Sequence, residues 1–451
     1  MRNGGAAALA MAHGLLRRHP LVDGHNDLAW KIRERFGLDL RQVDLTAPVA
    51  GTHTDLPRLR HGGVGAQFWS VYVPGRLQGE AAVTTTLEQI DLVHRMIRCY
   101  PDDLELAVTA DDVESAFSRG KIASLLGTEG GHSIANSMGV LRMLHRLGIR
   151  YMTLTHNLNV PWADSATDDP VTGGLSVFGQ EVVREMHRLG MLVDLSHVAA
   201  STARDVLQIA EAPVVFSHSG ARAVCDHPRN VPDDVLRQLG ANGGVCMVTF
   251  VPDFVSPRCR AWRLGLEAEM RRRGLDRKNP DVRAVVSGQY SADPPGPRAT
   301  LSEVADHIDH VRAVAGVDHV GIGGDYDGAD DLPDGLEDVA CYPALIAELL
   351  ARGWDQDECA RLIGGNVLRV MREAEAVSRS LSAQRGPATA SIGGRGHSDD
   401  RGTPLRFPRD NDVMGTTEHG QAASVRRSDE HPRETLDRSV RAPCLTLRVE
   451  L

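Results

Sequence analysis

The sequence lacks long hydrophobic runs, paired cysteines and an excess of basic charge, and each absence excludes a class of protein. In 451 residues, no apolar run approaches the ~20 residues that a membrane-spanning helix needs. The formal net charge of -10 argues against a nucleic-acid-binding protein, which would carry a basic surface. The seven cysteines include no C-x-x-C pair, which excludes a zinc ribbon and disfavours a disulfide framework.

Aromatic residues are also few, at 4%, whereas the chain contains 45 glycines and 19 histidines. Abundant glycine is expected where many tight loops leave strand ends, and histidine is the commonest metal ligand. The first twenty residues lack the strongly apolar core of a signal peptide and read instead as a helix leading into the first strand. We therefore expect a cytoplasmic protein without membrane attachment.

Short apolar runs alternate with amphipathic segments from about residue 20 to residue 375. Eight runs are predicted strands, at residues 20–24, 66–73, 122–127, 149–155, 191–196, 213–217, 244–250 and 319–324. Helices are predicted between most of them, for example at 84–98, 110–120, 176–190, 200–210 and 301–316. Continuously apolar strands that alternate with helices indicate a buried parallel sheet, and eight of them close a (β/α)₈ TIM barrel. An open doubly wound sheet is the alternative.

Two segments fall outside this alternation. Residues 262–299 are charged and proline-rich, and we interpret them as an insertion after the seventh strand. Beyond about Val377 the apolar periodicity ends, and residues 379–451 form a polar tail that cannot bury enough surface to offset its ordering entropy. The sequence thus predicts a barrel domain over residues 1–378 and a disordered tail over residues 379–451.

The ends of six predicted strands carry His, Asp or Glu side chains. These residues are His25, Asp27, Glu129, His156, His197, His218 and Asp325. Residues i and i+2 of an extended chain point to the same side, so His25 and Asp27 can bind one cation together. Any one of these residues could be a loop or capping residue. Six of the eight strand ends, at the face where barrel enzymes keep their sites, together predict a metal centre.

The other histidines serve as a comparison set. His94, His145, His187, His307 and His310 lie within helical patterns, where we expect surface or packing positions. His397, His419 and His431 belong to the tail, while His53, His61, His132 and His227 lie in loops that could line the mouth. Asp194 lies within a strand ahead of His197, so we expect a supporting role for it and no metal ligation.

Seven stretches of the chain together resemble one known family. They are LVDGHNDLAW, LLGTEGGHSI, LTHNLNVPWADS, GMLVDLSHV, FSHSGARAVCDHPRNVPDDVL, VADHIDHVRAVAGVDHVGIGGDYDG and GGNVLRV. Several are long and they follow the family's order, from about His19 to Met371. In these stretches the sequence resembles the membrane (renal) dipeptidases, peptidase family M19. The resemblance implies a metal-dependent hydrolase of the (β/α)₈ barrel type, with two Zn²⁺ ions per chain, short peptide substrates and usually a homodimer.

The resemblance also implies a role for each matching residue. His25 and Asp27 would bind one zinc ion, His197 and His218 the other, and Glu129 would bridge both. His156 would contact the substrate and Asp325 would handle protons during the reaction. Arg229 would bind the C-terminal carboxylate, for which a guanidinium fork is suited. Asn230 is a weaker candidate for the same pocket.

The implied activity is zinc-dependent hydrolysis of free dipeptides, in some relatives with a D-residue at the C-terminal position. Some relatives are lipid-anchored, but we do not carry membrane attachment over, and the 262–299 insertion leaves side-chain specificity open. Cys225 and Cys259 are expected to be free thiols in a reducing compartment.

Two alternatives stay open. One is another amide- or lactone-cleaving metal barrel, although such enzymes more often open with H-x-H and use a carboxylated Lys bridge. The other is a non-catalytic binding protein on the same barrel. A serine hydrolase is disfavoured, since the chain contains no G-x-S-x-G elbow.

Overall fold

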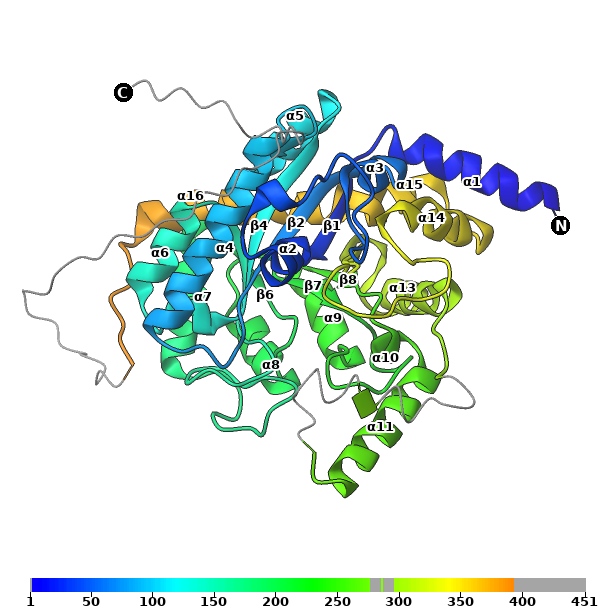
Figure 1. The fold of residues 1–451 in the computed structure, drawn as a ribbon. Helices are drawn as coiled ribbons and strands as arrows, with labels where there is room; N and C mark the ends of the chain where they lie inside the picture. The colour runs from blue at the N-terminus through cyan, green and yellow to red at the C-terminus, as the bar shows by residue number, and fades with distance from the viewer. Residues whose placement is uncertain (1, 276–284, 287–295, 393–451) are drawn as a thin grey trace, which may run out of the picture. The chain divides into compact units, whose positions relative to one another are not determined.

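The structure, a computed structural model, describes residues 2–275, 285–286 and 296–392. Its parallel strands form one nine-stranded sheet in the order β2-β1-β9-β8-β7-β6-β5-β4-β3, and an additional pairing joins β2 to β4. The strands are β1 Leu21–Asn26, β2 Val64–Tyr72, β3 Leu104–Leu106, β4 Ile122–Glu129, β5 Ile149–Thr153, β6 Leu192–Asp194, β7 Val215–Ser219, β8 Val245–Val248 and β9 Val320–Ile322. Because β2 pairs with β4, all strands except β3 close into a TIM barrel (Figure 1). The predicted barrel is confirmed, and the open sheet is excluded.

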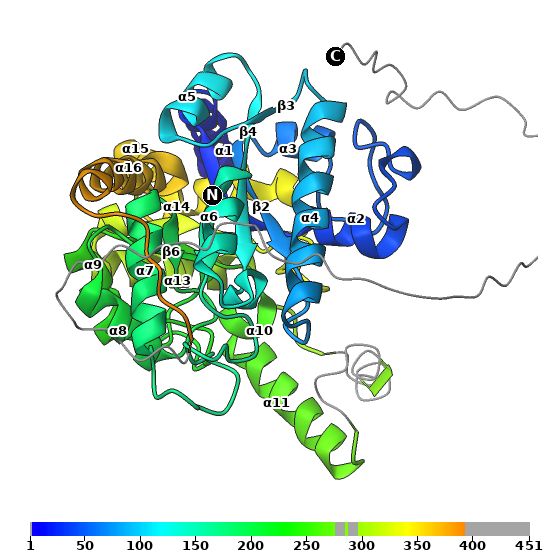
Figure 2. The same cartoon turned by 90° about the vertical axis from the view of Figure 1, so that its left-hand side faces the viewer.

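Helices surround the strands, as the two perpendicular views show (Figures 1 and 2). The helices are α1 Arg2–Leu16, α2 Leu28–Phe36, α3 Leu56–His61, α4 Glu80–Cys99, α5 Ala110–Ser118, α6 Met138–Arg146, α7 Val177–Leu189, α8 Ala200–Ile209, α9 Asp233–Asn242, α10 Pro252–Val255, α11 Pro257–Arg272, α13 Leu301–Ala315, α14 Tyr342–Ala351, α15 Gln356–Ala360 and α16 Asn366–Gln384. The local sequence marks where two of these helices start. Thr109 and Thr300 form capping boxes that satisfy free N–H groups in the first turns of α5 and α13.

The strand β3 is absent from the sequence prediction. Its three residues pair with Ile122–Ser124, the first half of β4, and leave the second half of β4 to pair with β5. A run of three residues with Glu105 at its centre has neither the length nor the apolar pattern that identifies a buried strand.

The barrel interior is filled by large side chains from strands that are not neighbours in the sheet. Phe68 of β2 and Tyr151 of β5 meet with ring centroids 5.1 Å apart. Gly127 of β4 leaves the space for the tyrosine ring, since a Cβ atom on Gly127 would lie 2.0 Å from the Cζ atom of Tyr151. A glycine two residues before Glu129 therefore serves the packing of the barrel beneath the strand ends.

The predicted insertion begins inside a helix. The helix α11 starts at Pro257, where the Ser256 side chain accepts a hydrogen bond from the N–H of Cys259, and it ends at Arg272. The insertion expected from residue 262 thus starts within a helix, whose own start at Pro257 is marked by a proline in the first turn and a serine cap. Residues 276–284 and 287–295 of the insertion lie outside the described residues.

The last helix extends past the predicted domain boundary. The helix α16 continues to Gln384, and the hydroxyls of Ser378 and Ser382 donate to the carbonyl of Arg188. Arg385 then forms an ion pair with Glu211. These polar contacts order residues 379–385 although their sequence has little apolar periodicity. Residues 393–451, the rest of the predicted tail, lie outside the described residues.

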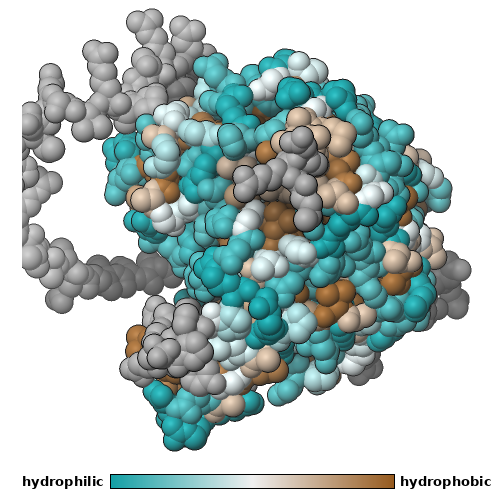
Figure 3. All heavy atoms as spheres, turned by 90° about the vertical axis from the view of Figure 1, so that its right-hand side faces the viewer, coloured by the Kyte–Doolittle hydropathy of each residue, from teal (hydrophilic) through white to brown (hydrophobic). Residues whose placement is uncertain are grey.

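The face shown in Figure 3 is mostly hydrophilic, with small separate hydrophobic patches, because the helices turn their apolar stripes toward the barrel. No helix in the described ranges is long and apolar enough to cross a membrane.

Candidate metal centre and substrate pocket

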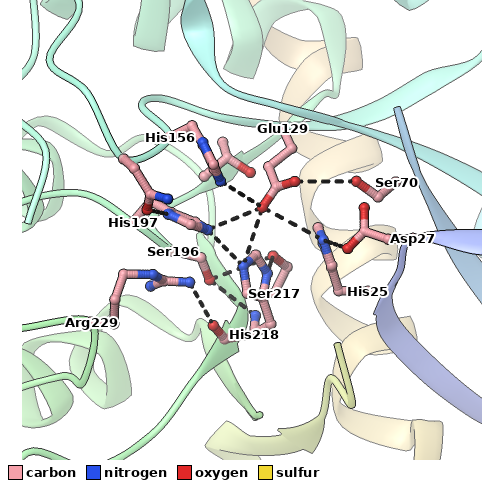
Figure 4. Close-up of polar contacts among 12 residues, drawn as sticks. His25, Asp27, Ser70, Glu129, His156, Ser196, His197, Ser217, His218 and Arg229 are labelled. Atoms are coloured by element: carbon pink, nitrogen blue, oxygen red, sulfur yellow. Dashed lines mark hydrogen bonds and ion pairs between the residues drawn. The ribbon is translucent and has the colours of Figure 1, made fainter. Parts of the chain in front are cut away.

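The carboxyl ends of four barrel strands bring the predicted ligands together. His25 lies in β1 with Asp27 just after it, Glu129 is the last residue of β4, and His218 lies in β7. His197 follows β6 in a left-handed backbone conformation, with a φ angle of 69°. All five side chains are buried, and Figure 4 shows them pointing toward one another.

Four imidazoles converge on a single carboxylate oxygen. The Oε1 atom of Glu129 lies 3.0 Å from Nε2 of His197, 3.5 Å from that of His218, 3.6 Å from that of His25 and 3.9 Å from that of His156. The same Nε2 atom of His25 lies 3.2 Å from Oδ2 of Asp27. Glu129 is therefore the central carboxylate of the cluster, as its predicted bridging role requires.

The electrostatics of the cluster favour an ionised Glu129 and mostly neutral imidazoles. Burial alone would raise the pKa of Glu129, but His25, His156 and His197 hold that pKa well below its usual range. Burial and the nearby Arg229 lower the pKa values of His197 and His218 well below normal. His25 is the exception: burial opposes its charge, but Tyr151, Glu129 and Asp27 raise its pKa well above normal.

These residues fit a bound cation. The Nε2 atoms of His197 and His218 are 2.9 Å apart, so two lone-pair positions face each other unless a proton or cation lies between them. The buried Nε2 of His25 and Oδ1 of Asp27 have no hydrogen-bond partner. Among the described residues, three sets of side chains have donor atoms close enough together to hold a metal ion. They are His25, Glu129 and His218; Glu129, His156 and His197; and His25, Asp27 and Asp325. Imidazole and carboxylate donors of this kind suit zinc.

Asp325 lies at the edge of this cluster on the turn after β9. Its φ angle of 61° is left-handed, and its backbone N–H donates to the carbonyl of His25. Burial raises the pKa of its carboxyl well above normal, with His25 acting in the opposite direction. Gly328 closes the turn, and a Cβ atom there would lie 2.3 Å from Oδ1 of Asp325 and 2.4 Å from Oδ2 of Asp27.

Arg229 lies beside the histidines, and its neighbour Asn230 faces the protein. The guanidinium of Arg229 donates to the hydroxyl of Ser219 and the carbonyl of His218, and its Nε is buried without a partner. Asn230 accepts from the N–H of Gly220 and donates to the carbonyls of Cys225 and Phe254. Those bonds occupy the Asn230 amide, which fixes the loop that carries Arg229; a substrate contact by Asn230 stays a prediction.

The remaining histidines lie mostly where the sequence suggested. His94, His145 and His310 are partly exposed on helices, and His187 and His307 are buried packing positions. Three of the four loop histidines lie near the mouth: His132 follows Glu129, His227 stacks on Phe254 beside Arg229, and the N–H of His53 donates to Asp327. His61 instead ends α3 just before β2, at the opposite end of the barrel.

Sequence reasoning missed several residues that contact this cluster. Tyr72 ends β2, and its ring lies 5.0 Å from that of His156 and 4.9 Å from that of Trp30, measured between centroids. Tyr151 and Ser217 contact the imidazoles from below. These residues read as ordinary strand residues in the sequence, and only barrel closure brings them to the site. Cys225 and Cys259, as expected, are free thiols.

A closed parallel barrel with histidines and carboxylates at the carboxyl ends of its strands is an arrangement typical of metal-dependent hydrolases. A family model described as membrane dipeptidase (peptidase family M19) matches residues 9–385. The chain therefore belongs to this family of metallo-dipeptidases.

Similar proteins agree with that assignment. Dipeptidase 3 of Mus musculus is 44% identical over 378 residues, covering 83% of this chain and 68% of that protein. Dipeptidase 3 of Homo sapiens is 43% identical over 378 residues, with coverages of 83% and 69%. The probable dipeptidase PvdM of Pseudomonas aeruginosa has a similar structure, with a TM-score of 0.70 at 23% identity and coverages of 82% and 99%. A metallo peptidase of Rhodobacter sphaeroides, liganded with a phosphinate mimic of the dipeptide L-Ala-D-Ala, has a TM-score of 0.65 at 25% identity, with coverages of 79% and 99%.

Proposed function

We propose that this protein is a zinc-dependent dipeptidase that hydrolyses free dipeptides and accepts a D-residue at the C-terminal position. The observation that carries the proposal is the convergence of four imidazoles on Glu129 with a buried guanidinium, that of Arg229, beside them. The phosphinate mimic of L-Ala-D-Ala bound by the similar Rhodobacter sphaeroides enzyme supports the stereochemical part.

Two zinc ions fit the donor atoms that the cluster offers. His25 and Asp27 would hold one ion, His197 and His218 the other, and Glu129 would contribute to both. Bound there, the ions would supply a water of lowered pKa and polarise the scissile carbonyl. Cobalt or manganese could fill the same donor set in vitro.

The other residues of the pocket would orient the substrate and move protons. Burial lowers the pKa of Arg229 to about 10, so the guanidinium stays charged at neutral pH and can bind a free C-terminal carboxylate. His156, whose pKa is lowered by burial, is neutral there and can donate to the oxygen on which negative charge develops. Asp325, with its raised pKa, can take the proton of the attacking water and pass it to the leaving amine.

A panel of peptides tests the proposal. Purified full-length protein would be assayed on L-L and L-D dipeptides and on their C-terminal amides, with chelator and with zinc added back. We expect zinc-dependent cleavage confined to the free dipeptides, and two zinc ions per chain by elemental analysis. Cleavage that survives complete metal removal, or no cleavage with two zinc ions bound, would exclude the proposed reaction. A cytoplasmic location and a homodimeric state stay predictions from the sequence.

A further inference from the structure

The three imidazoles assigned as zinc ligands all make a second contact, through the ring nitrogen that does not face Glu129. The Nδ1 atom of His25 lies 2.8 Å from the hydroxyl of Tyr151, and that of His218 lies 2.8 Å from the hydroxyl of Ser217. The Nδ1 atom of His197 lies 3.1 Å from Oδ1 of Asn157. In each case Nδ1 points away from the cluster, and Nε2 points into it.

The proton in each pair can be placed from the other bonds of the oxygen. The hydroxyl of Tyr151 donates to the carbonyl of Gly24 at 3.2 Å, so its oxygen is free to accept from Nδ1–H of His25. An amide oxygen such as Oδ1 of Asn157 can only accept. Each contact therefore places the imidazole proton on Nδ1.

The Ser217 contact ends on a buried carboxylate. The hydroxyl of Ser217 donates to Oδ2 of Asp194 at 2.7 Å and so accepts from Nδ1–H of His218. Asp194 is itself held by the hydroxyl of Thr153 and by the backbone N–H groups of Ser196 and Ser217. This chain of bonds fixes the ring of His218 and links it to a negative charge, the arrangement that raises the basicity of a metal-bound imidazole.

We propose that Tyr151, Asn157 and the Ser217–Asp194 pair are positioning residues that select the Nδ1–H tautomer of His25, His197 and His218, so that each Nε2 lone pair points to the metal. The inference rests on the proposed zinc function. Tyr151 would then affect only the ion that His25 binds together with Asp27. Ser217 would affect only the ion that His197 and His218 bind. Gly127 takes part indirectly, since only a residue without a side chain leaves room for the Tyr151 ring.

The test measures metal affinity, which a purely structural role would not change. Zinc dissociation constants of the full chain would be measured by competition with a fluorescent chelator for the wild type, Tyr151→Phe and Ser217→Ala. We expect each variant to bind one of the two ions about 10- to 100-fold more weakly and the other with unchanged affinity. Because no ligand is removed, kcat at saturating zinc should stay within a few-fold of the wild-type value.

Tyr100→Phe is the matched control. Its hydroxyl is also buried and bonded, accepting from the N–H of Leu45 and donating to the carbonyl of Val43, but it contacts no imidazole. Unchanged affinity for both ions in Tyr151→Phe and Ser217→Ala, or an equal loss in Tyr100→Phe, would overturn the inference. If one variant fails to fold, as judged by its thermal midpoint without metal, the other still decides. A wild type that binds no zinc would instead overturn the proposed function and, with it, the inference.

Discussion

Replacing Arg229 by methionine should separate substrate binding from chemistry. Arg229 is 4% exposed, and its bonds to Ser219 and His218 fix the direction of the guanidinium. A hydrogen bond to a charged group contributes about 1.5–3 kcal/mol, and 1.4 kcal/mol is a tenfold change in an equilibrium constant. Losing one such bond to the substrate carboxylate should raise KM for a free dipeptide by about 10- to 150-fold, with a smaller change in kcat.

The comparison substrate is the C-terminal amide of the same dipeptide. It has no carboxylate to lose, so Arg229→Met should change its kcat/KM far less than that of the free dipeptide. Arg229→Lys keeps the charge without the planar fork and should fall between the wild type and Arg229→Met. Zinc content and thermal midpoint, measured for each variant, identify losses caused by damage to the site. Equal losses for the free dipeptide and the amide would refute the carboxylate assignment.

Three further predictions concern proton transfer, packing and pH. Asp325→Asn should retain zinc and lose about 10²- to 10⁴-fold in kcat; near-normal turnover would remove Asp325 as the proton carrier. Gly127→Ala should lower the free energy of unfolding by about 1–3 kcal/mol and weaken zinc binding, since it displaces the ring of Tyr151; unchanged chemical denaturation would contradict this. Burial lowers the pKa of His307 to about 4, so the unfolded chain takes up this proton first as pH falls below about 6.5. Between about pH 6.5 and pH 4, the free energy of unfolding of the wild type should therefore fall by about 3 kcal/mol more than that of His307→Gln. Identical pH profiles of the two proteins would exclude the effect.

The sequence predicted most of the fold because strand and helix patterns are local. Each of the eight apolar runs became a barrel strand, and the helices at 84–98 and 301–316 match α4 and α13. The strand β3 was not predicted because three residues carry too little pattern to distinguish a strand from a loop. The end of the domain was placed too early because α16 is held after Val377 by serine hydroxyls and an ion pair, which hydrophobic periodicity does not report.

The site divides in the same way. His25, Asp27, Glu129, His197 and His218 could be found because each follows or ends an apolar run, where the barrel geometry brings strand ends together. The residues that contact these ligands from within the barrel could not be identified in this way. Tyr151 faces the barrel interior from β5 and meets His25 of β1 only because the sheet closes. Asn230, three residues before the start of α9, is a weaker prediction for the pocket, and its amide is bonded to three backbone groups that the sequence pattern could not reveal.

The pairing of β2 with β4 also bears on how the folded chain avoids aggregation through unpaired strand edges. A closed sheet has no row of unpaired backbone groups on which a foreign strand could add, and such rows are the usual starting points of aggregation. Among the described strands, β3 alone stands at an open end of the hydrogen-bonded order. It is three residues long, and its central Glu105 is paired with Arg119 and Lys121. A short strand that carries charge at its exposed side offers little to an incoming strand, so the one open edge is protected by brevity and charge.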